Sequence, residues 1–131
     1  RSLESQVLQA IGERHSLVVA TGGGVITQQE NWGVLHQGIV IWLAPERAQL
    51  LERLLVDPGA RPLLQERNPA AALNALLEAR TPLYAEADLR ITVGDETVSA
   101  VTERILEAIP GILKPHELMF QAPNAPQTTE D

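Results

Sequence analysis

The segment Leu17-Val18-Val19-Ala20-Thr21-Gly22-Gly23-Gly24 decides how the chain is interpreted. Its first four residues form a short apolar run rich in valine, which is typical of a strand buried on both faces of a sheet. Three glycines follow at once, and without side chains they let the backbone approach a ligand and present N–H groups to it. A permissive turn explains these glycines equally well when they are considered alone. The segment therefore predicts a buried strand that ends in a binding loop or a plain turn.

Two further apolar runs, at residues 39–43 and 89–93, also predict buried strands. Helical patterns surround them, at residues 1–14, 28–36, 45–56, 68–81 and 95–109. Alternation of buried strands with helices predicts an α/β layer fold with a parallel sheet. Ligands in such folds bind outside the carboxyl ends of the strands.

The helical patterns carry specific expectations about their faces and their ends. Leu3, Val7 and Ile11 recur at four-residue spacing and should share one face of the first helix. We expect Pro45 in the first turn of a helix and Asn68-Pro69 at the start of another. Thr81-Pro82 should break or kink that helix, because a residue before proline is pushed out of the helical region. Asp95 is the expected cap of the last helix.

Length and composition exclude several classes of protein. The chain has 131 residues, enough for one domain, and a formal net charge of -7, which argues against a nucleic-acid module. Cysteine is absent, so disulfides, thiolate metal sites and a cysteine nucleophile are excluded. No apolar run is long enough to predict a membrane span. Prolines and a polar end predict a flexible tail over residues 110–131, which leaves residues 1–109 as the domain.

Two arginines stand in contexts that suit anion binding. Arg61 begins Arg61-Pro62-Leu63-Leu64 in a predicted loop, where an arginine can close over phosphates during phosphoryl transfer. Arg80 lies near a predicted helix C-terminus, where its guanidinium can hold a carboxylate. Plainer explanations are a solvated loop arginine for the first and an interaction with the helix dipole for the second. The histidines lack metal-ligand spacing, so no metal site is predicted.

Taken together and in order, these pieces resemble the shikimate kinase family over residues 1–109. The segments that carry the resemblance are Arg1-Ser2-Leu3-Glu4 (R-x-x-E), Thr21-Gly22-Gly23-Gly24, Ala60-Arg61-Pro62-Leu63-Leu64, Arg80-Thr81-Pro82-Leu83-Tyr84-Ala85-Glu86-Ala87-Asp88 and the last strand-helix pair. The resemblance implies a P-loop fold like that of nucleoside monophosphate kinases. It also implies transfer of the ATP γ-phosphoryl group to the shikimate 3-hydroxyl, in chorismate and aromatic amino acid biosynthesis, with ATP as co-substrate and Mg²⁺ as the ion.

The resemblance also implies roles for individual residues. Arg1 and Arg80 match the two arginines that hold the shikimate carboxylate. Gly22, Gly23 and Gly24 match the glycine stretch packed against the substrate ring. Arg61 matches the lid arginine that reaches the ATP phosphates, which makes it the expected catalytic and ATP-binding residue. The chemistry agrees, because a small anionic ring needs bidentate cations at one end and close backbone contact elsewhere.

The sequence departs from the family in one large respect. It has no G-x-x-x-x-G-K-[ST] phosphate loop, and Lys114, its only lysine, lies in the predicted tail. The aspartate that contacts the reacting hydroxyl in the family is also absent. The family sheet has the order 2-3-1-4-5, and the three predicted strands correspond to the last three, so the first two are missing. Because the absent first strand is central, we expect unpaired strand edges and an unstable or repacked sheet.

We therefore expect the chain to be the C-terminal portion of a longer kinase and to be inactive by itself. A non-catalytic binding or regulatory protein of the same family explains the missing lysine but not Arg1, Arg61 and Arg80. Another kinase of this fold, such as a gluconate kinase, is less consistent with the glycine segment and the paired arginines. Shikimate and ATP are the expected partners, without nucleic acid or membrane. We expect the intact protein to be a monomer in the cytoplasm, or in the plastid if the source is a plant.

Overall fold

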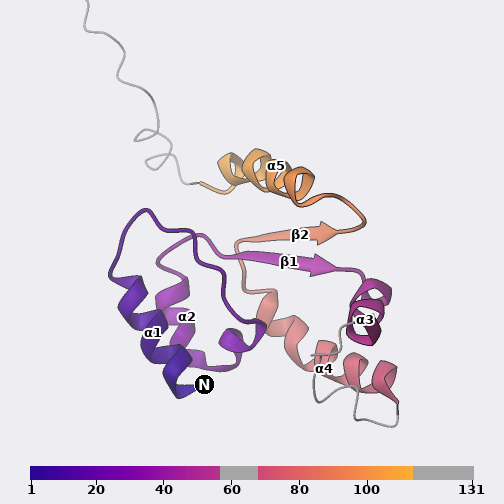
Figure 1. Ribbon diagram of the computed structural model, residues 1–131. Helices are drawn as coiled ribbons and strands as arrows, with labels where there is room; N and C mark the ends of the chain where they lie inside the picture. The colour runs from indigo at the N-terminus through magenta and orange to yellow at the C-terminus, as the bar shows by residue number, and fades with distance from the viewer. Residues whose placement is uncertain (57–67, 114–131) are drawn as a thin grey trace, which may run out of the picture.

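The structure, a computed structural model, describes residues 1–56 and 68–113 (Figure 1). Its elements are α1 (Ser2–Gly12), the 3₁₀ helix η1 (Gly23–Thr27), α2 (Gln29–Leu35), β1 (Ile41–Pro45), α3 (Arg47–Val56), α4 (Pro69–Tyr84), β2 (Leu89–Val93), α5 (Val98–Ala108) and the 3₁₀ helix η3 (Ile109–Gly111). This order confirms the predicted α/β fold class. Arg61 and residues 114–131 of the predicted tail lie outside the described residues.

The two strands pair in parallel, with Ile41 opposite Leu89 and Pro45 opposite Val93. Just before the pairing begins, the Asp88 carboxylate accepts a 2.7 Å hydrogen bond from the Val40 backbone N–H. Figure 1 shows α5 on one side of the sheet and α1, α2 and α4 on the other. Helices therefore lie on both sides of the parallel sheet, as the alternation of elements predicts.

Residues 17–20 do not form the predicted buried strand. Val18 is fully exposed, and Leu17 and Val19 are about half exposed. A strand needs a neighbour for its backbone N–H and C=O groups. Within the described residues β1 pairs only with β2, so residues 17–20 have no strand beside them. This outcome agrees with the expectation that a sheet without its central strand keeps unpaired edges.

The expected helix position of Pro45 and the expected helix break at Pro82 are wrong, whereas Pro69 begins α4 as predicted. Pro45 ends β1, and α3 begins only at Arg47; the end of a strand accepts proline because few ladder hydrogen bonds remain to be made there. Pro82 lies inside α4, which continues to Tyr84 instead of breaking. Pro82 removes only its own backbone N–H donor, and the helix hydrogen bonding resumes after it, since the Ala85 N–H donates to the Thr81 carbonyl at 2.9 Å.

The helix caps are partly as predicted. Asn68 caps α4, since its Oδ1 accepts a 3.2 Å hydrogen bond from the Ala71 N–H. The cap of α5 is Thr97 and not Asp95, because the Thr97 Oγ1 accepts from the Ala100 N–H at 3.1 Å. Asp95 lies too far before the helix to cap it, and its Oδ1 accepts from Gln49 Nε2 at 2.8 Å. That contact ties the turn after β2 to α3.

A small core joins α1, η1 and α2. It is formed by Leu8, Val25, Ile26 and Trp32, with Val34, Leu35, Val40, Leu83 and Tyr84 packed against it. The predicted apolar face of α1 is wrong in part, because Leu3 and Val7 are exposed while Leu8 is buried. This core holds the start of α1, the glycine segment and the end of α4 together. No helix within the described ranges is long and apolar enough to cross a membrane.

Candidate functional site

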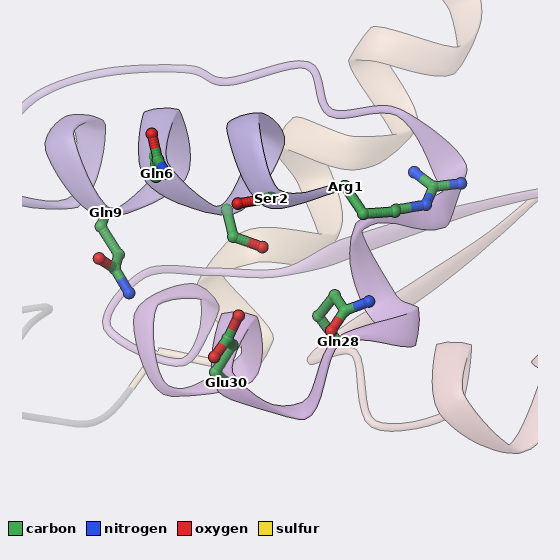
Figure 2. A pocket seen from close by; sticks show the side chains of 7 residues that line it. Arg1, Ser2, Gln6, Gln9, Gln28 and Glu30 are labelled. Carbon is green, nitrogen blue, oxygen red and sulfur yellow. The ribbon is translucent and has the colours of Figure 1, made fainter.

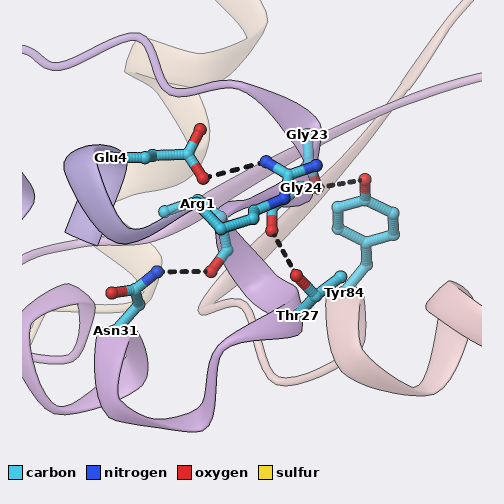
Figure 3. Close-up of polar contacts among 8 residues, drawn as sticks. Arg1, Glu4, Gly23, Gly24, Thr27, Asn31 and Tyr84 are labelled. Atoms are coloured by element: carbon cyan, nitrogen blue, oxygen red, sulfur yellow. Dashed lines mark hydrogen bonds and ion pairs between the residues drawn. The ribbon is translucent and has the colours of Figure 1, made fainter.

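Arg1 lies at the start of α1 and is held by its own helix. Its Nη1 is 3.0 Å from Glu4 Oε1, at the i, i+3 spacing that makes neighbours on a helix surface. The Arg1 guanidinium lies against Gly24, in the space that a Cβ there would occupy (Figure 3). The Arg1 side chain is half exposed, so an oriented cation stands beside the glycine segment and remains open to solvent.

The backbone of the glycine segment is fixed from two sides. The Thr27 Oγ1 donates to the Gly24 carbonyl at 2.7 Å, and the Tyr84 hydroxyl donates to the Gly23 carbonyl at 2.8 Å (Figure 3). Gly24 is buried, whereas Gly23 is exposed. The turn is therefore held by side chains from η1 and from the end of α4.

Close contact accounts for the three glycines better than a permissive turn does. A Cβ on Gly22 would lie 3.2 Å from Glu4 Oε2, and one on Gly23 would lie 2.9 Å from the Tyr84 hydroxyl. None of the described glycines has a positive φ, so the backbone conformation alone does not demand glycine here. The glycines are small because side chains from α1 and α4 pack directly against them. Packing of the chain's own side chains therefore accounts for the glycines, and the approach of a ligand to this backbone stays a prediction.

Arg80 lies on α4, four residues before Tyr84, and so on the same face of the helix. Its residue is half-buried, and no hydrogen bond or ion pair within the described ranges involves its guanidinium. The Tyr84 hydroxyl brings this face of α4 to the glycine segment. The structure thus joins Arg1 to Gly24 directly, and places Arg80 on the helix face that reaches them.

Sequence reasoning assigned no role to Glu4 or Tyr84, although both lie in the segments it quoted. The signal available was spacing: Arg1 and Glu4 are three residues apart, and Arg80 and Tyr84 are four apart. Trp42 of β1 was also missed, and its ring stacks on that of Tyr84 at 5.5 Å between centroids with an 18° interplanar angle. Glu4 and Tyr84 contact Arg1 and Gly23 of the predicted site, and Trp42 packs on Tyr84.

A polar pocket of 310 Å³ lies beside Arg1 but is separate from the glycine segment (Figure 2). Its lining consists of Arg1, Ser2, Ser5, Gln6, Gln9, Gln28 and Glu30. In Figure 2 the Arg1 guanidinium points away from Gln6 and Gln9. Amide and hydroxyl groups dominate this lining, with one carboxylate, so the pocket does not concentrate positive charge. This pocket is therefore not the candidate site for an anion.

Two features that could hold a metal ion or a nucleotide are missing from the described part of the molecule. Over residues 1–56 and 68–113, no cluster of three or more His, Asp or Glu could hold a metal ion. The sequence has no phosphate-binding loop that ends in Lys followed by Ser or Thr. The arrangement suits binding. The Arg1 guanidinium can pair with an anionic group, and the glycine backbone can contact a flat or ring-shaped polar molecule.

The parallel sheet with helices on both sides places the chain in the α/β class of proteins. Within that class, the family model described as shikimate kinase matches residues 1–110, and the chain belongs to the shikimate kinase family. The shikimate kinase of Parasynechococcus marenigrum (strain WH8102) is 63% identical over 114 residues, covering 87% of this chain and 60% of the relative. That of Nostoc punctiforme is 46% identical over 116 residues, covering 88% and 64%.

The chain spans about 60% of the length of these curated relatives. Among solved structures, a shikimate kinase from Acinetobacter baumannii in complex with shikimate has a TM-score of 0.76 at 39% identity, covering 84% of this chain and 62% of that one. A shikimate kinase from Bacteroides thetaiotaomicron has a TM-score of 0.69 at 23% identity, covering 83% and 66%, which shows likeness of fold. The predicted family and its kinase fold are confirmed.

Proposed function

We propose that this chain supplies the shikimate-binding part of an ATP-dependent shikimate kinase, in chorismate and aromatic amino acid biosynthesis. The observation that carries the proposal is the contact of the Arg1 guanidinium, oriented by Glu4, with Gly24. An oriented guanidinium beside an exposed backbone turn suits a small ring that bears a carboxylate. The similarity to the shikimate complex of the A. baumannii enzyme supports shikimate as that ring.

In this proposal Arg1 and Arg80 hold the shikimate carboxylate, one from α1 and one from α4. A guanidinium binds a carboxylate through two parallel hydrogen bonds, which fixes direction as well as distance. In this proposal the ring lies against the backbone of Gly22, Gly23 and Gly24, next to the Arg1, Glu4 and Tyr84 side chains that already pack on these glycines. Two cations at one end and backbone at the other position the substrate hydroxyls without covalent chemistry.

Arg61, which lies outside the described residues, is proposed to reach the ATP phosphates. Its support is the Arg61-Pro62-Leu63-Leu64 segment together with membership of a family that uses ATP. Positive charge over the transferring phosphoryl group lowers the barrier, which makes Arg61 the proposed catalytic residue. ATP and Mg²⁺ complete the proposal as co-substrate and ion, and the intact enzyme is proposed to be a cytoplasmic monomer.

A hybrid protein tests this function. In it, the matched segment of the P. marenigrum relative is replaced by this chain, so that the remainder of a shikimate kinase is present. Arg80→Ala should weaken shikimate binding by about 2–5 kcal/mol, because it removes one partner of a desolvated charge pair. Arg61→Ala should lower kcat strongly and leave the shikimate KM nearly unchanged. Arg14→Ala, at an exposed arginine after α1, is the control and should change neither.

The outcomes separate the alternatives. An unchanged shikimate KM in both Arg1→Ala and Arg80→Ala would remove the carboxylate role. A kcat that survives Arg61→Ala would reduce that arginine to a surface residue. A hybrid that binds shikimate but transfers no phosphoryl group would favour the non-catalytic binding or regulatory protein over the kinase.

A further inference from the structure

We infer that Tyr84 is a positioning residue for the substrate: its hydroxyl fixes the orientation of the Gly23–Gly24 peptide. The inference rests on the proposed function, since it adds a residue to the same site. It starts from the 2.8 Å hydrogen bond that the Tyr84 hydroxyl donates to the Gly23 carbonyl (Figure 3). This contact joins residues 61 positions apart in the sequence, so it also sets where the end of α4 lies relative to η1.

The hydrogen bond determines which way the neighbouring amide points. The described chain contains no cis peptide bonds, so the Gly23 carbonyl and the Gly24 N–H lie on opposite sides of one planar unit. With the carbonyl held by Tyr84, the Gly24 N–H points away from the tyrosine. The same peptide lies in the turn that the Val25 N–H closes by donating to the Gly22 carbonyl at 3.2 Å, and Thr27 holds the following carbonyl, of Gly24. The Tyr84 hydroxyl is the side chain that holds the Gly23 carbonyl itself, at an exposed glycine.

The Tyr84 ring is itself held in place. It packs against the core cluster and stacks on Trp42, with 5.5 Å between ring centroids. The Trp42 ring in turn contacts the Arg90 guanidinium, whose central carbon lies 4.5 Å from the ring centroid. Arg90 is directly opposite Trp42 in the β1–β2 register, so the contact belongs to the sheet itself. The hydroxyl is therefore anchored through the sheet and not on a loose loop.

Gly23 and Tyr84 fit each other sterically as well. A Cβ on Gly23 would lie only 2.9 Å from the Tyr84 hydroxyl oxygen, which is closer than real Cβ contacts allow. The hydroxyl thus both demands a glycine at this position and orients its carbonyl. Removing the oxygen with Tyr84→Phe keeps the ring, its stacking and its packing. The effects of substituting Gly23 and Tyr84 on shikimate binding should consequently not be additive in free energy.

The test is a double-mutant cycle in the hybrid protein, with shikimate KM, ATP KM and kcat measured for each variant. Tyr84→Phe should raise the shikimate KM about 3- to 10-fold, the value of one neutral hydrogen bond, with kcat and ATP KM within about twofold. Gly23→Ala should raise the shikimate KM more. In the double variant the loss should be smaller than the product of the two single losses, because the added methyl group no longer meets an oxygen.

A matched control separates positioning from stability. Thr97→Ala removes the cap of α5, away from the glycine segment, and should lower the unfolding temperature without changing the shikimate KM. If Tyr84→Phe behaves like Thr97→Ala, with a lower unfolding temperature and an unchanged KM, the inference is overturned. Strictly multiplicative effects of Gly23→Ala and Tyr84→Phe would overturn it too. A hybrid with an intact fold that does not bind shikimate at all would instead reject the proposed function, and this inference with it.

Discussion

The guanidinium of Arg1 occupies the space that a side chain on Gly24 would need. The two residues are 23 positions apart in the sequence and meet because the core of α1, η1 and α2 brings them together. Glu4 adds direction, because its carboxylate holds the guanidinium at 3.0 Å. Arg1 is thus oriented by Glu4 of its own helix and packs on the backbone of Gly24. Holding the guanidinium in place before an anion binds reduces the entropy cost of binding.

This contact predicts the effect of Gly24→Ala. The new methyl group must displace the Arg1 guanidinium, which is the far end of a flexible side chain. The backbone of Gly24 has no positive φ, so the alanine adds no backbone strain. We expect stability to fall by less than about 1 kcal/mol, and the shikimate KM of the hybrid protein to rise about tenfold or more through loss of a charge-assisted hydrogen bond.

Gly38→Ala is the control for this variant, because a Cβ on Gly38 meets nothing within 4 Å. Its shikimate KM should equal that of the unmutated hybrid. If Gly24→Ala also keeps the unmutated KM while the protein remains folded, the position of Arg1 has no part in binding.

A second pair of glycines tests the packing of α1 on α2. A Cβ on Gly12 would lie 2.5 Å from Val34 Cγ1, and a β-branched side chain has little freedom to turn away. Gly12→Ala should lower the free energy of unfolding by about 1–3 kcal/mol. Gly33→Ala on α2 meets open space and should raise it by about 0.5–1 kcal/mol, since alanine favours helix. Urea unfolding of the hybrid protein measures both, and effects of equal sign would contradict this packing.

The sequence predicts those elements that are determined by neighbouring residues, and it fails for those that depend on contacts between distant segments. Residues 89–93 are a strand as predicted, and residues 28–36 contain α2, because the apolar patterns that predict them lie in neighbouring residues. Residues 17–20 are apolar enough for a strand but lack a partner within the described chain, and pairing is not local. The exposure of Leu3 and Val7 has the same origin, since the face that α1 buries is chosen by what packs on it.

The candidate site divides in the same way. The glycine segment and Arg80 were singled out by motif and residue type, and Arg1 by the family resemblance; their binding roles stay predictions. Tyr84 was not singled out, because its role depends on a contact with Gly23 across 61 residues. A tyrosine at the end of a helix is ordinarily explained by its apolar ring. The hydrogen bond of its hydroxyl is visible only in the structure, where α4 contacts η1.

A further prediction concerns the effect of Asn31 on the free energy of unfolding. It is 1% exposed, and its Nδ2 donates a 2.9 Å hydrogen bond to the Val25 carbonyl in the core. Asn31→Ala leaves that carbonyl buried without its partner. It also removes the Asn31 Oδ1, which is buried with no hydrogen-bond partner among the described residues, so the net cost in the free energy of unfolding should be about 1 kcal/mol. Gln29→Ala, at an exposed position on the same helix, should change it by less than about 0.5 kcal/mol. Equal values for the two variants in urea unfolding would show that the hydrogen bond does not secure η1.

The two threonines of α5 provide the last prediction. The Thr97 Oγ1 accepts a 3.1 Å hydrogen bond from the Ala100 N–H, which satisfies one donor of the first turn. Thr97→Ala should therefore lower the free energy of unfolding by about 1 kcal/mol. The Thr102 Oγ1 donates at 2.8 Å to the Val98 carbonyl, which already accepts within the helix. Thr102→Ala should accordingly be neutral or stabilising by a few tenths of a kcal/mol, because alanine is the better helix former. Urea unfolding of the hybrid protein compares them, and a larger loss for Thr102→Ala would show that α5 is not capped at Thr97.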